Sequence, residues 1–294
     1  MTTITEDELV ASFEAQFELH RGRSDYFYSD CGGRLSLDWQ NVYEKLLDCF
    51  DPSQREQLEN QVNSLFSQPG THRIMDQGCG HAMSLNETTL RFAREHPNQH
   101  FEGYGLSTSI EDIWIGSKAE FNSLTSEEFD LLEKHGIRAL KLLTAPENTA
   151  FFGIEKDLHT ALRNFPYNLD LVFSDNTYFH LVVPWMAAKH TAERLTRGGI
   201  ALFRTIFQNR IIDTSTEPIL EAELVKHLQD NNPGYEILTS SPRYGRLVLA
   251  IIKQKDSPFI TNQHIGWKHN DSGRYLKTVY SEHLQKGMIA IDDF

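Results

Sequence analysis

The chain has 294 residues, of which 39% are hydrophobic and 23% charged, and its formal net charge is -13. This length suits one large domain with additions or two small ones, and the negative charge disfavours a partner that is held through its phosphate backbone. No apolar run reaches the roughly 20 residues of a membrane helix, and the acidic start (Glu6, Asp7, Glu8) is unlike a secretory signal. We therefore expect a cytoplasmic protein with no membrane partner and no nucleic-acid partner.

The chain contains three cysteines, Cys31, Cys49 and Cys79, and their spacing does not match that of a metal site. Few cysteines fit a reducing compartment and argue against a disulfide framework. We expect no metal ion in the functional site.

Residues 5–67 are predicted to be mostly helical, because apolar residues recur near helical spacing and Asp51-Pro52-Ser53 has the composition of a helix start. Pro69 and Gly70 then predict a turn. We expect a helical extension or lid over residues 1–70, an α/β domain over 71–255 and a C-terminal extension over 256–294.

After residue 70, short apolar runs alternate with helical stretches, as in parallel α/β folds. The predicted strands are 73–75, 101–106, 169–173 and 199–207, and the predicted helices are 84–96, 183–195 and 217–230. The third strand is left open between 137–143 and 150–154. A mostly helical insertion is predicted over 110–135, and a terminal antiparallel pair over 235–240 and 246–253.

The first apolar run ends in an acid and a bare turn, Asp76-Gln77-Gly78-Cys79-Gly80-His81-Ala82. Glycines between a strand and a helix let a ligand approach the backbone near the free N–H groups of the helix N-terminus. Met83 stands where a dinucleotide-binding turn has its third glycine, which disfavours NAD and FAD, and no Gly-Lys-Ser/Thr follows, which excludes a Walker loop.

The pattern D-x-G-x-G-x-A resembles the first motif of the class I S-adenosylmethionine-dependent methyltransferases. The stretch 169–180 and the Gly-Gly turn before 200 look like the fourth strand of this family, its following loop and the approach to the fifth strand. The resemblance implies a Rossmann-like, seven-stranded, mostly parallel sheet with helices on both faces, S-adenosylmethionine as cofactor and S-adenosylhomocysteine as product.

The resemblance also assigns cofactor contacts to individual residues. The amino-acid end would lie on the first motif, that is on Asp76, Gly78, Cys79, Gly80 and Ala82. The ribose would lie at the end of the second strand, on Gly105, Leu106 and Ser107, but glycine at 105 replaces the acid that accepts the ribose hydroxyls in the family. Ser107, Thr108 or Glu111 could take over this role.

Two further regions complete the predicted site. Asp157 matches the family's adenine-binding acid, with capping of a helix at 158–164 as the alternative. Ser174 would contact the cofactor near the transferred methyl group, and Asp175, Tyr178 and His180 are the candidate catalytic residues, with His180 as a base. The alternative is that residues 178–180 are ordinary packing.

These features predict methyl transfer to oxygen or nitrogen of a small-molecule acceptor, and the loop after the fourth strand lacks the signature of enzymes that methylate nucleic-acid bases or protein glutamine. A catalytically silent binding or regulatory protein of the same fold is the alternative, favoured by Gly105. Aminopropyl transfer is disfavoured because no acid-rich loops for a polyamine are evident. A homodimer is left open.

Overall fold

The computed structural model describes residues 6–20, 41–80, 82–107, 119–121, 136–142, 145–175, 177–178, 181, 184–204, 226, 228–240 and 248–260. The strands are β1 (Thr71–Gln77), β2 (His100–Ser107), β3 (Ala119–Phe121), β4 (Ile137–Leu142), β5 (Thr149–Glu155), β6 (Leu169–Ser174), β7 (Leu195–Arg204), β8 (Tyr235–Thr239) and β9 (Val248–Lys253). The helices are α1 (Glu6–His20), α3 (Val42–Leu47), α4 (Pro52–Phe66), α5 (Met83–Glu95) and α8 (Pro184–Arg194).

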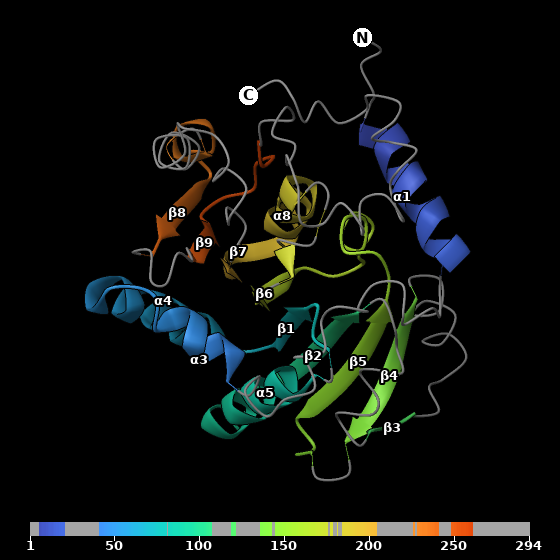
Figure 1. Ribbon diagram of the computed structural model, residues 1–294. Coiled ribbons are helices and arrows are strands. Elements are labelled where there is room, and N and C mark those ends of the chain that lie inside the picture. Colours follow the sequence, from blue (N-terminus) through green and yellow to red (C-terminus); the bar gives the residue numbers. More distant parts are fainter. Residues whose placement is uncertain are drawn as a thin grey trace.

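The strands form one nine-stranded sheet in the order β3-β4-β5-β2-β1-β6-β7-β9-β8 (Figure 1). Strands β5, β2, β1, β6 and β7 are parallel, and β9 and β8 add an antiparallel pair beside β7. The predicted α/β fold with a seven-stranded, mostly parallel sheet is confirmed by these seven strands, and both alternatives for the third strand are strands of the sheet.

Strands β3 and β4 extend the sheet beyond the predicted seven. β4 pairs antiparallel with β5, and β3 pairs antiparallel with β4. The prediction of helix over 110–135 is therefore wrong for residues 119–121, and the rest of that insertion lies outside the described residues. Backbone pairing with an exposed strand edge outweighs local helical propensity here.

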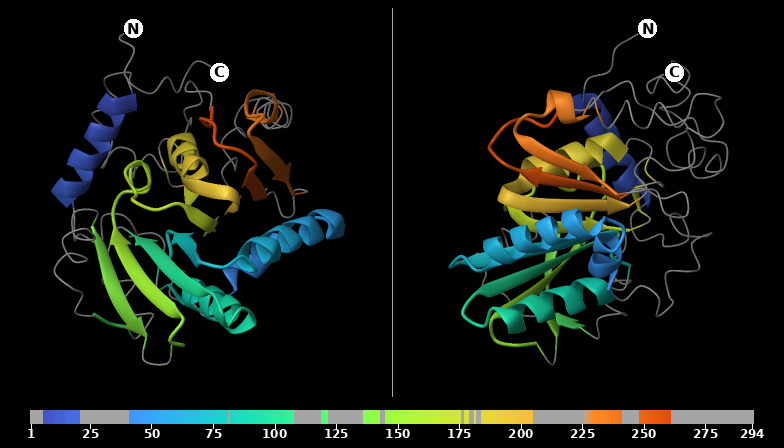
Figure 2. Two further views of the ribbon diagram at one scale, coloured as in Figure 1. Left: turned by 180° about the vertical axis from the view of Figure 1, so that it is seen from behind. Right: turned by 90° about the vertical axis from the view of Figure 1, so that its left-hand side faces the viewer.

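Helices cover both faces of the sheet: α3, α4 and α5 lie on one face and α8 lies on the other (Figures 1 and 2). The first face packs in a cluster that includes Phe66, Phe92 and Phe173, and the second in a cluster that includes Tyr104, Ala188 and Phe203. The two apolar layers hold the carboxyl ends of the parallel strands at one edge, which is where open α/β sheets bind ligands.

The helices before residue 70 form where their sequence favours them. Asp51 caps α4 by accepting a hydrogen bond from the backbone N–H of Gln54 at 2.9 Å, and Pro52 is the first helical residue. Leu58, Val62, Leu65 and Phe66 recur at helical spacing and are buried against the sheet. Residues 42–66 thus share a core with the sheet, and the predicted division at residue 70 stays a prediction.

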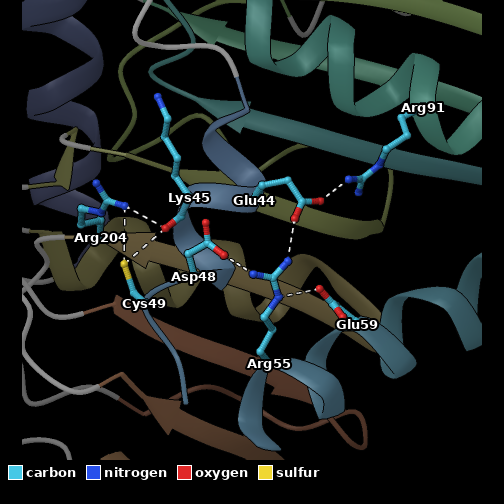
Figure 3. A network of polar contacts seen from close by, with 8 residues as sticks. All are labelled: Glu44, Lys45, Asp48, Cys49, Arg55, Glu59, Arg91 and Arg204. Atoms are coloured by element: carbon cyan, nitrogen blue, oxygen red, sulfur yellow. Dashed lines mark hydrogen bonds and ion pairs between the residues drawn. The ribbon is translucent and has the colours of Figure 1, made fainter. Parts of the chain in front are cut away.

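Charged side chains join α3, α4 and α5 on their outer surface (Figure 3). Glu44 of α3 pairs with Arg91 of α5, and it also pairs with Arg55 of α4 at 3.1 Å. Arg55 in addition contacts Asp48, and its Nε lies 2.7 Å from Glu59.

No described helix is long and apolar enough to cross a membrane.

Candidate functional site

The predicted glycine turn lies at the carboxyl end of β1, in the middle of the parallel sheet. Gly78, Gly80 and Ala82 have φ of 75°, 51° and 54°, in the left-handed region that favours glycine. The backbone N–H groups of Gly78 and Cys79 donate to the carbonyl of Leu106 on β2, at 2.8 and 3.1 Å. Ala82 is the N-cap residue of α5, and no side chain of the described residues caps this helix. The turn therefore presents backbone at a helix N-terminus.

The two glycines of the turn have different surroundings. A Cβ at Gly78 would stand 2.1 Å from Oγ1 of Thr177, a residue that follows β6, so the loop after β6 packs directly on the turn. A Cβ at Gly80 would meet no heavy atom of the described residues within 4 Å. Among the described residues, nothing fills the space beside the backbone of residue 80.

Asp76, the acid at the end of the first strand, is buried with 5% of its surface exposed. Its register partners are Gly105 on β2 and Phe173 on β6, and Gly105 is paired on its other side with Gly153 of β5. Ser107 and Glu155 are the next register pair on the same face, at the ends of β2 and β5. Asp76 and Glu155 therefore lie on one face at the carboxyl edge, with Gly105 and Gly153 at the level of Asp76 and Glu155 one level further along that face.

Asp157 lies two residues after β5 and is buried with 4% exposed, in contrast to the exposed capping residue considered as the alternative. Its Oδ1 accepts from the backbone N–H of His159 at 2.8 Å and lies 2.7 Å from His159 Nδ1. Residues 158–164 form turns, so the predicted helix is wrong there. Phe13 of α1 stacks on the His159 ring at 4.1 Å between centroids, and Asp7 pairs with Arg163. The N-terminal helix is therefore docked on the segment that carries Asp157 (Figure 1).

Asp175 follows β6 and is ion-paired with Arg204, the last residue of β7, with 3.3 Å between Oδ2 and Nη1. Arg204 also donates from Nη2 to the carbonyl of Lys45 at 3.1 Å and to Sγ of Cys49 at 3.6 Å (Figure 3). Only 5% of the Asp175 side chain and 15% of the Arg204 side chain are exposed. The pair fixes the first residue after β6 against β7 and against the end of α3.

Tyr178 and Ser174 lie inside the protein, on the side of the glycine turn away from solvent. The Tyr178 hydroxyl donates to Oε1 of Gln77 at 2.6 Å, and Ser174 Oγ donates to the Gln77 carbonyl at 2.7 Å. Burial raises the pKa of the Tyr178 phenol well above its usual range. The phenol is therefore a hydrogen-bond donor near neutral pH, and it is fully buried.

Several predicted residues lie outside the described residues. They are His180, Thr108 and Glu111, and residues 261–294 of the predicted C-terminal extension. His180 as a base stays a prediction. Among the described residues, no group of three His, Cys, Asp or Glu side chains could hold a metal ion.

The structure adds residues to the site that sequence reasoning missed. Glu155, Thr177 and Arg204 reach the carboxyl edge from three different strands or loops, and His159 holds Asp157. Only Glu155 had a sequence signal, since it is an acid that ends an apolar run beside Asp157. The contacts of Arg204 and Thr177 join segments far apart in the chain, so no local pattern reports them.

No protein-family model and no curated protein matches the sequence. Among solved structures, the plantazolicin methyltransferase BpumL bound to S-adenosylhomocysteine aligns with 85% of this chain and 99% of its own, at 15% identity and a TM-score of 0.42. A Listeria monocytogenes protein assigned to the class I S-adenosylmethionine-dependent methyltransferases aligns with 96% of this chain and 81% of its own, at 11% identity and a TM-score of 0.42. An O-methyltransferase family protein of Burkholderia thailandensis aligns with 87% and 75%, at 14% identity and a TM-score of 0.38.

The sheet itself shows the fold. The seven strands that the resemblance implied are present, with the antiparallel pair at one edge and the glycine turn after the central strand β1. The chain has the Rossmann-like α/β fold, with a mostly parallel sheet and helices on both faces, that the resemblance implied.

Proposed function

We propose that the protein transfers a methyl group from S-adenosylmethionine to oxygen or nitrogen of a small-molecule acceptor. The observation that carries the proposal is the turn from Asp76 to Ala82, which lies at the carboxyl edge of a methyltransferase-like sheet. Its backbone is left-handed at three positions, and a Cβ at Gly80 would meet no described atom. Such a turn fits the approach of a ligand to the backbone.

The residues of the described edge fit the three parts of the cofactor. Asp76 and the turn would hold the amino-acid end, and Asp157, oriented by His159, would bind the adenine. Gly105 stands where the family has its ribose-binding acid, and Ser107 and Glu155 would bind the ribose instead. These two residues are register partners one level beyond Gly105 and Gly153 on the same face. A carboxylate that accepts ribose hydroxyls makes strong, charge-assisted hydrogen bonds.

When bound, the cofactor supplies the methyl group on a positively charged sulfur. The chain then has to orient the acceptor for an in-line displacement and exclude water, and positioning can supply most of the rate. The Asp175–Arg204 pair fixes the start of the loop that would line the acceptor side. Tyr178 would act indirectly, by holding the loop in place through its hydroxyl, since its phenol is buried and stays protonated.

A small acceptor suits the charge of the chain better than a nucleic acid does. The formal net charge of -13 opposes phosphate backbones. The neighbours do not decide the acceptor, since the solved structures that align include a plantazolicin methyltransferase and an rRNA methylase. We infer an acceptor without phosphate groups.

The first experiment is calorimetric titration of the purified chain with S-adenosylmethionine and S-adenosylhomocysteine. We expect micromolar binding that Asp76→Asn weakens at least about tenfold, which corresponds to 1.4 kcal/mol. Glu147, an exposed acid before β5, provides the control variant Glu147→Gln, which should bind like the wild type. No heat and no thermal shift at millimolar ligand would refute the proposal.

A second candidate function is a catalytically silent protein of this fold that binds a partner. Gly105 favours it, because the usual ribose acid is missing. Cofactor binding separates the two candidates, and loss of binding in Glu155→Gln would show that the acid has moved to the next strand.

A further inference from the structure

Gln77, which follows Asp76 and precedes the first glycine, is fully buried and lies among polar side chains. Its Oε1 accepts from Tyr178 Oη at 2.6 Å, and its Nε2 donates to Thr191 Oγ1 of α8 at 2.9 Å. Its carbonyl accepts from Ser174 Oγ at 2.7 Å. All four residues are buried, with no surface exposed.

Alternation along β1 explains why Gln77 reaches this cluster. Successive side chains of a strand point to opposite faces, so Gln77 points to the α8 face when Asp76 points to the face of α5. The amide therefore connects the cofactor turn with α8 and with the loop after β6. Burying an amide is unfavourable unless its hydrogen bonds are made, and here both ends of the amide have partners.

The loop after β6 is attached to the turn at a second point. The Thr177 side chain occupies the place that a Cβ of Gly78 would need, with its Oγ1 at 2.1 Å from that position. Ser174 thus contacts the Gln77 carbonyl, and Tyr178 contacts the side-chain amide of Gln77. Thr177 lies against the backbone of Gly78. A shift of the turn has to move the loop.

We propose that Gln77 is a positioning residue that couples the glycine turn to the loop after β6, so that a ligand on the turn orders the acceptor side. The proposal rests on the proposed function for the identity of that ligand. Gln77 itself does not touch the ligand side, because its amide is buried on the opposite face. Closed sites gain rate from such preorganisation of the groups around the acceptor.

The test is hydrogen exchange at described residues of two segments, 76–80 in the turn and 175, 177 and 178 after β6, with and without S-adenosylhomocysteine. Tyr178→Phe removes the hydroxyl, which donates to Gln77 and also lies 3.3 Å from Thr191 Oγ1, and Gln77→Met removes the amide at similar volume. Tyr104→Phe is the matched control, because Tyr104 is equally buried and its hydroxyl donates at 2.9 Å to Glu102, away from the turn.

In the wild type and in Tyr104→Phe, ligand should slow exchange in both segments. In Tyr178→Phe and Gln77→Met, it should slow exchange in the turn, but the loop should lose about three- to tenfold of its protection, the effect of one buried hydrogen bond. Loop protection in both variants equal to the wild type would overturn the coupling. A purely structural role would lower loop protection by the same factor with and without ligand, and that result would overturn the coupling as well.

The failure of the proposed function gives a different result. If the wild type shows no binding of S-adenosylhomocysteine, methyl transfer is refuted, and the unliganded proteins decide the coupling. Tyr178→Phe should then speed exchange in the turn relative to Tyr104→Phe, and equal turn exchange in these two variants would overturn it.

Discussion

The two glycines of the turn should respond differently to the same substitution, alanine. Both have positive φ, which costs an alanine roughly 1–2 kcal/mol. At Gly78 the new methyl group would also stand 2.1 Å from Thr177 Oγ1, 2.6 Å from its Cγ2 and 2.8 Å from its Cβ. Overpacking of this kind costs about 1–3 kcal/mol. We therefore expect Gly78→Ala to lose about 2–5 kcal/mol and Gly80→Ala about 1–2 kcal/mol of unfolding free energy.

Gly80→Ala, the variant with the smaller loss of unfolding free energy, should nevertheless lose affinity for the ligand. At Gly80 the added methyl group meets no described atom, so it enters the space that we assign to the cofactor. Gly80→Ala should remain folded and lose S-adenosylhomocysteine binding about tenfold or more, or 1.4 kcal/mol. Urea unfolding with unchanged slope gives the stabilities, and calorimetry gives the affinities. Equal stability losses would refute the Thr177 contact, and full affinity of Gly80→Ala would refute the position of the cofactor.

Three further predictions concern pH, the ribose and the ion pair at the edge. Burial raises the pKa of four tyrosines in the folded chain. Above about pH 10 the unfolded chain therefore loses these protons first, and the folded chain holds more of them. The unfolding free energy then falls by about 1.4 kcal/mol per pH unit for each tyrosine. The four tyrosines are Tyr43, Tyr104, Tyr178 and Tyr235, the last with a pKa raised to about 12. Unfolding in urea from pH 8 to 11 should show the fall, and Tyr104→Phe should make it shallower. If the ribose lies beside β2, Gly105→Asp should tighten S-adenosylhomocysteine binding in calorimetry, whereas Gly105→Ala should not. Looser binding of the Asp variant would show that residue 105 makes a different contact. Arg204→Met should cost about 3 kcal/mol in urea unfolding, because it removes the cation from the buried Asp175, and a loss under about 1 kcal/mol would contradict a strong pair.

The central strands could be predicted from the sequence because their signals are local. The stretch Leu169–Ser174 is buried at every residue, and its apolar residues, Leu169 and 171–173, indicate a strand inside an α/β sheet. Asp51 and Pro52 predicted the start of α4 through capping and the fixed backbone of proline. Such rules need only neighbouring residues.

The edge of the sheet and the polar contacts of the site depend on distant partners. β4 and β5 appeared as alternatives for one strand, because each is short and nothing in the sequence indicates that they pair with each other. The side chain of Gln77 contacts Thr191 and Tyr178, each more than 100 residues away. A glutamine in a turn is most simply predicted to be exposed, and only the fold shows that it is buried.

The site also shows why a motif match cannot say what each of its residues does. Gly78 and Gly80 occupy equivalent places in the pattern. Gly78 makes room for Thr177, whereas the described residues leave space beside Gly80. The missing acid at Gly105 likewise has a different meaning once the register is known, because Ser107 and Glu155 lie one level further along the same face. If Glu155→Gln abolished S-adenosylhomocysteine binding while Gly105→Ala preserved it, the acid would have moved one strand without loss of the site. If neither changed binding, the ribose would be held by residues beyond β2 and β5, and the assignment of the carboxyl edge would have to be revised.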